Sequence, residues 1–203
     1  MTQRFPESFP KGFKPNFRKH LLTAPQNTPI PNSDKISDRL VFTVSMGDLF
    51  GEWVPQEWID AVLDSVRNAP DYWLFLFLTK NPKRLPTIVF PDNCWVGATA
   101  DTQVRATEII EVFRGWHDAR PEVLFMSCEP LNERIDLMQG LHIDGDIKNV
   151  IDWLIIGGQT GTNSRQPEWD WVELLTDQAR ENDIAVYYKP NLTVRPREYP
   201  VYE

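Results

Sequence analysis

Residues 72–79 form the stretch YWLFLFLT, in which apolar side chains occupy nearly every position. A strand with one face in water would alternate apolar and polar residues, so this continuous run predicts a strand that is buried on both faces. Buried strands of this kind are typical of parallel sheets that are covered by helices. The stretch therefore indicates a largely parallel α/β protein.

Further apolar runs rich in β-branched and aromatic residues lie along the chain, at residues 40–45, 94–99, 123–128, 153–157 and 184–189. They alternate with longer segments whose apolar residues recur every three or four positions. The alternation predicts about six βα units, which fit either an incomplete, TIM-like β/α barrel or an open doubly wound sheet. Both architectures place their ligands at the loops that follow the carboxyl ends of the strands.

Three of the intervening segments carry the signals of amphipathic helices. Pro55 can take the first position of one helix, Thr102 or Asp101 can cap the second, and Pro167 can open the third. The apolar residues expected on the buried faces are Trp58, Ile59, Val62, Leu63 and Val66, then Val104, Ile109, Ile110, Phe113 and Trp116, then Trp171, Leu174, Leu175 and Ala179. Residues 132–149 predict a loop with a short helix.

The composition is that of an ordinary globular chain, with 203 residues, of which 41% are hydrophobic and 25% charged. No run approaches the roughly 20 apolar residues that cross a bilayer, and the start has no apolar signal core, so we expect a cytoplasmic protein without a membrane partner. Two cysteines are too few for a disulfide framework, which fits a reducing compartment. A formal charge of -8 argues against a nucleic-acid partner.

The first 36 residues differ from the rest of the chain. They are rich in Pro, Phe and Lys and show no clean periodicity. We therefore expect residues 1–36 to form an extended amino-terminal arm that packs on a partial barrel domain formed by residues 37–203.

Polar residues follow each predicted strand. Because parallel strands deliver their last residues to one rim, a carboxylate, an ammonium group and a glycine turn can converge there around a small-molecule ligand. The candidate ligand-binding residues are Ser45, Asp48, Thr79, Lys80, Ser127, Glu129, Gly157, Gly158, Gln159 and Lys189. The five that we expect around one pocket mouth are Asp48, Lys80, Glu129, Gln159 and Lys189.

Several of these candidates also have a purely structural explanation. The glycines of residues 157–161 fit an anion-binding turn or simply a tight turn, and they lack the spacing of phosphate-binding loops. Glu129 ends a buried run and needs a partner, so it fits either a catalytic carboxylate or an ion pair with Lys80 or Lys189. Lys80 and the basic residues after it also fit a solvated helix start.

The two cysteines predict no metal site of their own. Neither Cys94 nor Cys128 belongs to a ligand-spaced pair. Cys128 would be a nucleophile only beside an activating base, and the three histidines lie in segments away from the rim. We interpret Cys128 as a buried thiol.

The chain resembles a bacterial and phage-encoded family of unknown function, often described as radical-SAM-like and marked by an amino-terminal three-cysteine motif. The similar segments are RFPESFPKGFKPNF, FTVSMGDLFGEWVP, FLFLTKNPKRL, CWVGATA, LFMSCEPL, DWLIIGGQTG and VYYKPNL. The resemblance implies an incomplete β/α barrel that holds a 4Fe-4S cluster on the cysteine loop and S-adenosylmethionine across the strand ends. This sequence starts without that motif, and it has Gln159 where relatives commonly have Glu in GGESG.

The resemblance implies a radical S-adenosylmethionine enzyme that lacks its iron–sulfur-binding front and is inactive as given. The alternative is a non-catalytic barrel of a phage or mobile element that binds a nucleotide-like ligand or a protein partner. A nucleic-acid-associated factor is a third hypothesis, which the basic arm favours and the net charge opposes. A missing first unit would expose the edge of the strand at 40–45, which residues 5–17 or a second copy of the chain are expected to cover.

Overall fold

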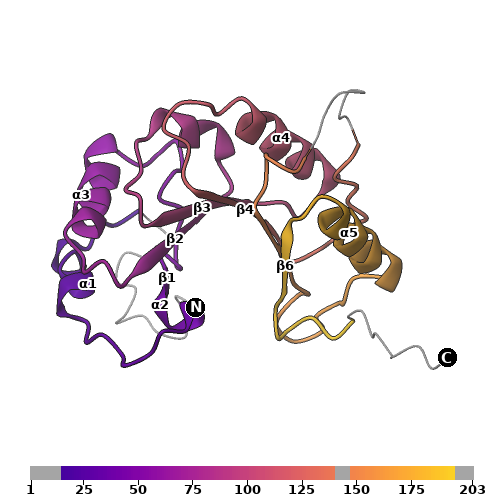
Figure 1. Cartoon of the computed structure of the whole chain (residues 1–203), viewed down its shortest axis with the longest axis horizontal. Coiled ribbons are helices and arrows are strands. Elements are labelled where there is room, and N and C mark those ends of the chain that lie inside the picture. The colour runs from indigo at the N-terminus through magenta and orange to yellow at the C-terminus, as the bar shows by residue number, and fades with distance from the viewer. Residues whose placement is uncertain (1–14, 140–146, 195–203) are drawn as a thin grey trace.

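The computed structural model describes residues 15–139 and 147–194. Six strands form one sheet in chain order, and each neighbouring pair is parallel. The strands are β1 (Leu40–Phe42), β2 (Leu74–Thr79), β3 (Cys94–Thr99), β4 (Val123–Cys128), β5 (Trp153–Ile156) and β6 (Ala185–Tyr188). Figure 1 shows that the sheet curls into a half-barrel. This confirms the incomplete parallel β/α barrel over the open doubly wound sheet, in which the strand order would reverse.

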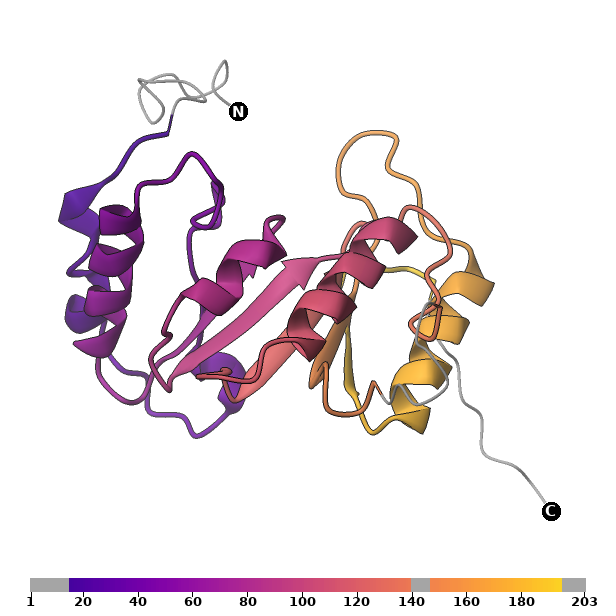
Figure 2. The same ribbon diagram turned by 90° about the horizontal axis from the view of Figure 1, so that it is seen from above.

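Helices cover the convex side of the sheet (Figures 1 and 2). The helices after the strands are α3 (Gln56–Arg67), the 3-10 helix η2 (Pro82–Thr87), α4 (Gln103–Arg114) and α5 (Trp169–Glu181). Three shorter helices precede β1, namely η1 (Lys19–Leu21), α1 (Ala24–Asn27) and α2 (Ile36–Arg39). Residues 132–139 and 147–149 contain turns and no helix, and the rest of that predicted loop lies outside the described residues.

The boundaries of the elements depart slightly from the predicted ones. β1 ends at Phe42 rather than at residue 45, because the chain turns there and Val44 adopts a left-handed conformation with φ of 49°. Pro55 caps α3 instead of opening it, and α5 begins two residues after Pro167. β2, β5 and β6 are shorter than the predicted runs by one or two residues.

Helix α4 differs from the prediction in one residue of its buried face and in the group that caps its amino end. Val104, expected on the buried face, is 78% exposed, because the face that meets the sheet begins two residues later at Ala106. Thr102 is the N-cap residue, but its side chain makes no capping bond. The backbone N–H of Gln103 instead donates to Glu133 Oε1 at 2.6 Å, so a distant carboxylate caps the helix.

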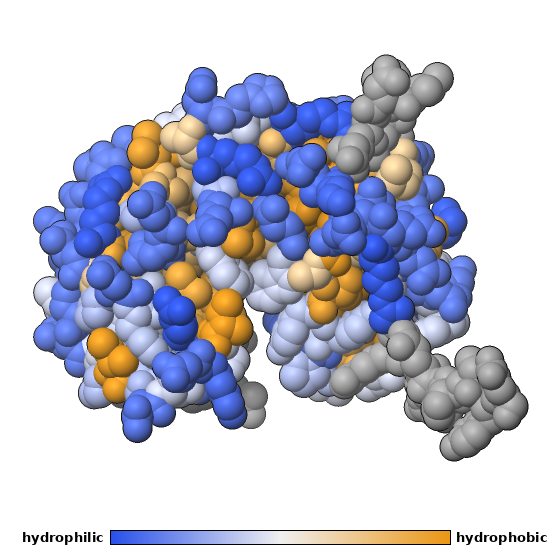
Figure 3. All heavy atoms as spheres, in the orientation of Figure 1, coloured by the Kyte–Doolittle hydropathy of each residue, from blue (hydrophilic) through white to orange (hydrophobic). Residues whose placement is uncertain are grey.

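The alternation of side chains along each strand creates two separate apolar clusters. The larger one lies between the convex face and the helices and includes Phe77, Val96 and Met126. The smaller one lies on the concave face and consists of Leu76, Phe125 and Ile155, with the partly buried Leu40, Leu78, Trp95 and Trp153 packed against them. All seven come from strands, and Figure 3 shows a hollow between the two ends of the curled sheet.

The described part of the arm is folded rather than extended. It contains η1 and α1, and it packs along α3. The ring of Phe17 stacks on Trp58 at a centroid distance of 5.2 Å, and Gln26 donates a hydrogen bond to the Ser65 carbonyl at 2.9 Å. The division of the chain at residue 36 and the covering of the β1 edge stay predictions, and residues 5–14 lie outside the described part of the chain.

Candidate functional site

The predicted site residues lie along the edge of the half-barrel where the six parallel strands end, because the topology delivers every strand end to that edge. They form two groups rather than one. Asp48, Thr79 and Lys80 lie at the ends of β1 and β2, and Glu129, Gly157 and Lys189 lie at the ends of β4 to β6. Among the five residues expected around one mouth, the only direct contact that the described structure records joins Glu129 to Lys189.

Asp48 holds the first group together. Its Oδ1 accepts hydrogen bonds from the Phe50 N–H at 3.0 Å and the Thr79 hydroxyl at 2.6 Å. Its Oδ2 accepts from the Lys80 N–H at 2.8 Å and the Asn81 amide at 2.9 Å. Four bonds use the acceptor capacity of a carboxylate, so Asp48 and Thr79 fasten the loop after β1 to the end of β2. The neighbouring Ser45 is exposed in the turn after β1.

Lys80 carries the positive charge of this group. Its Nζ lies 3.4 Å from Asp101 Oδ2, and its side chain is half exposed. Asp101 also lies 3.1 Å from Nη1 of Arg105 on α4. The Lys80 contact is therefore long and shared, and the ammonium group can turn toward another anion at little cost.

Glu129 and Lys189 form the centre of the second group, at the ends of β4 and β6. Lys189 Nζ donates to Glu129 Oε2 at 2.5 Å, and the Asn191 amide donates to Glu129 Oε1 at 3.1 Å. The side chains of Glu129 and Lys189 are 22% and 39% exposed, so the pair is partly shielded from water yet remains reachable. The sequence allowed Lys80 or Lys189 as the partner of Glu129, and in the structure the partner is Lys189.

Asn191 also belongs to this group, although the sequence did not predict it as a ligand-binding residue. Its amide also donates to the Gly158 carbonyl at 2.8 Å, while its buried Oδ1 has no hydrogen-bond partner among the described residues. The signal that could have found it is its place two residues after Lys189, in the polar segment that follows a buried strand.

The glycine pair makes room for neighbouring side chains. A Cβ at Gly157 would lie 2.9 Å from Glu129 Cγ, and a Cβ at Gly158 would lie 2.6 Å from the Gln166 amide. The Gly157 N–H already donates to the Cys128 carbonyl at 3.1 Å. Gly157 therefore lets Glu129 approach β5 closely, and its N–H is not open to an anion.

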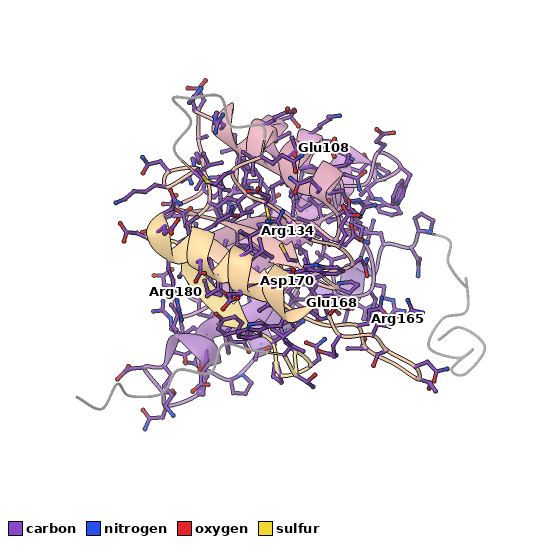
Figure 4. All side chains as sticks on the ribbon, turned by 90° about the vertical axis from the view of Figure 1, so that its right-hand side faces the viewer. Glu108, Arg134, Arg165, Glu168, Asp170 and Arg180 are labelled. Carbon is purple, nitrogen blue, oxygen red and sulfur yellow. The ribbon has the colours of Figure 1, made fainter. Side chains whose placement is uncertain are left out.

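Gln159 organises the loop that leads from β5 toward α5. Its amide donates to Asn132 Oδ1 at 3.1 Å, its side-chain oxygen accepts from the Arg165 N–H at 3.2 Å, and its own N–H donates to the Arg165 carbonyl at 3.2 Å. Figure 4 shows Arg165 on this projecting loop and Glu168 and Asp170 at the start of α5. A glutamate could not donate the bond to Asn132, so the amide suits this loop.

The two cysteines are fully buried on neighbouring strands, and burial raises the pKa of each thiol to about 12. Ser127, the remaining candidate, lies one residue before Cys128 and is also buried. Among the described residues no three His, Cys, Asp or Glu side chains are grouped as metal ligands. These residues do not fit an iron–sulfur cluster, which needs accessible thiolates.

Comparison with known proteins places the chain in a family. No curated protein and no solved structure matches it. Within the described ranges, no helix is long and apolar enough to span a bilayer. A family model matches residues 2–196, which is nearly the whole chain. The chain therefore belongs to the family described as "Protein of unknown function (DUF5131)".

Proposed function

We propose that this chain binds a small zwitterionic ligand at the rim formed by the ends of β4 to β6, and that the ligand is S-adenosylmethionine, as the family resemblance implies. The observation that carries the proposal is the partly buried pair of Glu129 and Lys189 beside the unpartnered oxygen of Asn191. An amino acid group presents an ammonium and a carboxylate, which match Glu129 and Lys189 in charge.

The energetics of this group favour a ligand. Lys189 uses one of its three N–H donors on Glu129, and Glu129 accepts two bonds of the roughly four that a carboxylate can accept, so each keeps capacity for an opposite charge of the ligand. A buried carbonyl oxygen without a donor costs about 1–3 kcal/mol. A ligand N–H or O–H that reaches Asn191 Oδ1 would remove this cost, and Glu129, Lys189 and Asn191 are thus the residues that would hold the ligand.

Radical chemistry does not follow from the described residues, because they offer no ligand set for a 4Fe-4S cluster. The proposal is therefore binding, and no reaction step is assigned. The fold supports the placement of the ligand, since barrels of parallel strands carry their sites in the loops after the strands.

Isothermal titration calorimetry with S-adenosylmethionine tests the proposal on the chain as it is. We expect a Kd below about 1 mM, in the range of ordinary enzyme–substrate affinities. Glu129→Gln and Lys189→Met should each weaken binding about 10-fold or more, since bonds to charged groups are the stronger ones. Methionine alone should show the same dependence on both residues.

A second ion pair serves as the matched control. Lys83 and Glu108 lie 2.8 Å apart on the outer surface, between η2 and α4. Lys83→Met and Glu108→Gln should leave the affinity unchanged. Absence of binding to the unaltered chain, or equal losses in the control variants, would refute the proposed function.

A further inference from the structure

The concave face of the half-barrel carries two hydroxyl side chains, each two residues before a charged residue, Asp101 or Glu129. Thr99 and Ser127 are register partners on β3 and β4, and they are 6% and 2% exposed. Their neighbours Ala98 and Met126 belong to the core on the convex side, so alternation places both hydroxyls on the concave side. The described structure records no hydrogen bond from either hydroxyl to another residue.

The hydroxyls of the other two buried threonines are bonded within the chain. Thr79 is buried and donates to Asp48, and Thr176 is buried and donates to the Val172 carbonyl at 2.7 Å. Neither hydroxyl oxygen is among the buried side-chain atoms without a partner in the described structure, so both keep some contact with the solvent in the hollow. Thr99 and Ser127 together offer a donor and acceptor pair to whatever enters the hollow.

Aromatic rings line the concave face in the next row toward the amino ends of the strands. Gly97, Phe125 and Trp153 are register partners across β3 to β5. A Cβ at Gly97 would lie 2.4 Å from Phe125 Cδ2, so the glycine lets that ring lie over β3. The Trp153 ring lies 5.6 Å from Phe125 and 6.0 Å from Tyr187, and Tyr187 is 46% exposed.

We propose that the concave face holds a flat aromatic ring that carries a hydrogen-bonding group on its edge. The ring packs against Trp153 and Tyr187, and its polar group bonds to Ser127 and Thr99. Offset and edge-to-face packing of aromatic rings favours a flat ring over a saturated one of equal size. This inference rests on the proposed function, which places the first ligand at the ends of β4 to β6. The aromatic ring would occupy a second site on the same strands, closer to their amino ends.

Benzamide is the probe, because it is a flat ring with one amide, and cyclohexanecarboxamide is the control probe with the same amide and no aromatic face. Binding is followed by NMR through the indole N–H signals of the full chain, with the Trp153 signal assigned by Trp153→Phe. We expect benzamide to bind weakly, with Kd of about 1–10 mM, and to shift the Trp153 signal. Cyclohexanecarboxamide should bind several-fold more weakly.

The variants Ser127→Ala and Thr99→Val keep the size of the side chain nearly constant and should each weaken benzamide binding by about 3- to 10-fold. Trp169→Phe, at an exposed position on α5, is the matched control and should change nothing. No shift of the Trp153 signal, equal binding of the two probes, or no effect of the hydroxyl variants would overturn the inference. Glu129→Gln should weaken S-adenosylmethionine binding about 10-fold or more and leave benzamide binding unchanged, so the two proposals fail separately.

Discussion

Replacing Asp48 by Asn should lower the free energy of unfolding by more than an isosteric change on a loop normally does. The carboxylate accepts four hydrogen bonds, two on each oxygen. An amide in the same place keeps one acceptor oxygen and turns an NH₂ group toward the two other donors. Two bonds to a charged acceptor, each contributing about 1.5–3 kcal/mol, are thereby lost. Because Asp48 is only partly buried, we expect the lower end, a loss of about 3 kcal/mol.

A loss of about 3 kcal/mol is a large part of the 5–15 kcal/mol that stabilises a typical domain. In a chain of this size it should lower Tm by roughly 6–12 °C. Urea unfolding followed by tryptophan fluorescence measures the change, and Asp60→Asn on the exposed face of α3, where the carboxylate accepts one bond from Gln56, is the control. A loss below about 1 kcal/mol for Asp48→Asn, or an equal loss for the control, would refute the four-bond arrangement.

Two further predictions concern the thiols and the glycine at the rim. Burial raises the pKa of Cys94 and Cys128 to about 12, while in the unfolded chain both thiols ionise near 9. The stability that the two protonated thiols contribute is therefore complete below pH 9 and is lost as pH rises toward 12. Between pH 8 and 10 each thiol should lower the free energy of unfolding by about 1.4 kcal/mol. In a chain with both cysteines changed to Ala, the free energy of unfolding should not show this decrease with pH. The native thiols should also resist Ellman's reagent, and iron and sulfide should form no stoichiometric cluster on this chain; rapid reaction or a stable cluster would contradict the burial. Gly157→Ala should cost about 1–3 kcal/mol because its Cβ would displace Glu129, whereas Gly47→Ala, whose Cβ would lie at 3.7 Å from its nearest neighbour, should be close to neutral in the same urea titration.

The sequence by itself determined the parallel α/β class and the edge on which the polar residues gather. Continuous apolar runs such as residues 72–79 are legible because a strand buried on both faces needs no alternation, and parallel pairing then carries every strand end to the same rim. The choice between a curled half-barrel and an open sheet was not determined, since strand order depends on contacts between distant segments.

Only the tertiary structure decided what each polar residue does. Asp48 and Glu129 both follow apolar runs, yet Asp48 is saturated by four donors of its own chain while Glu129 keeps a reachable partner in Lys189. Asn191 has a buried side-chain oxygen that lacks a partner among the described residues, and the hydroxyls of Thr99 and Ser127 face the concave side of the sheet. Hydrogen-bond satisfaction is a property of groups brought together from 30 to 60 positions apart, so a linear pattern can locate a polar residue at a rim but cannot tell whether its bonds are already made.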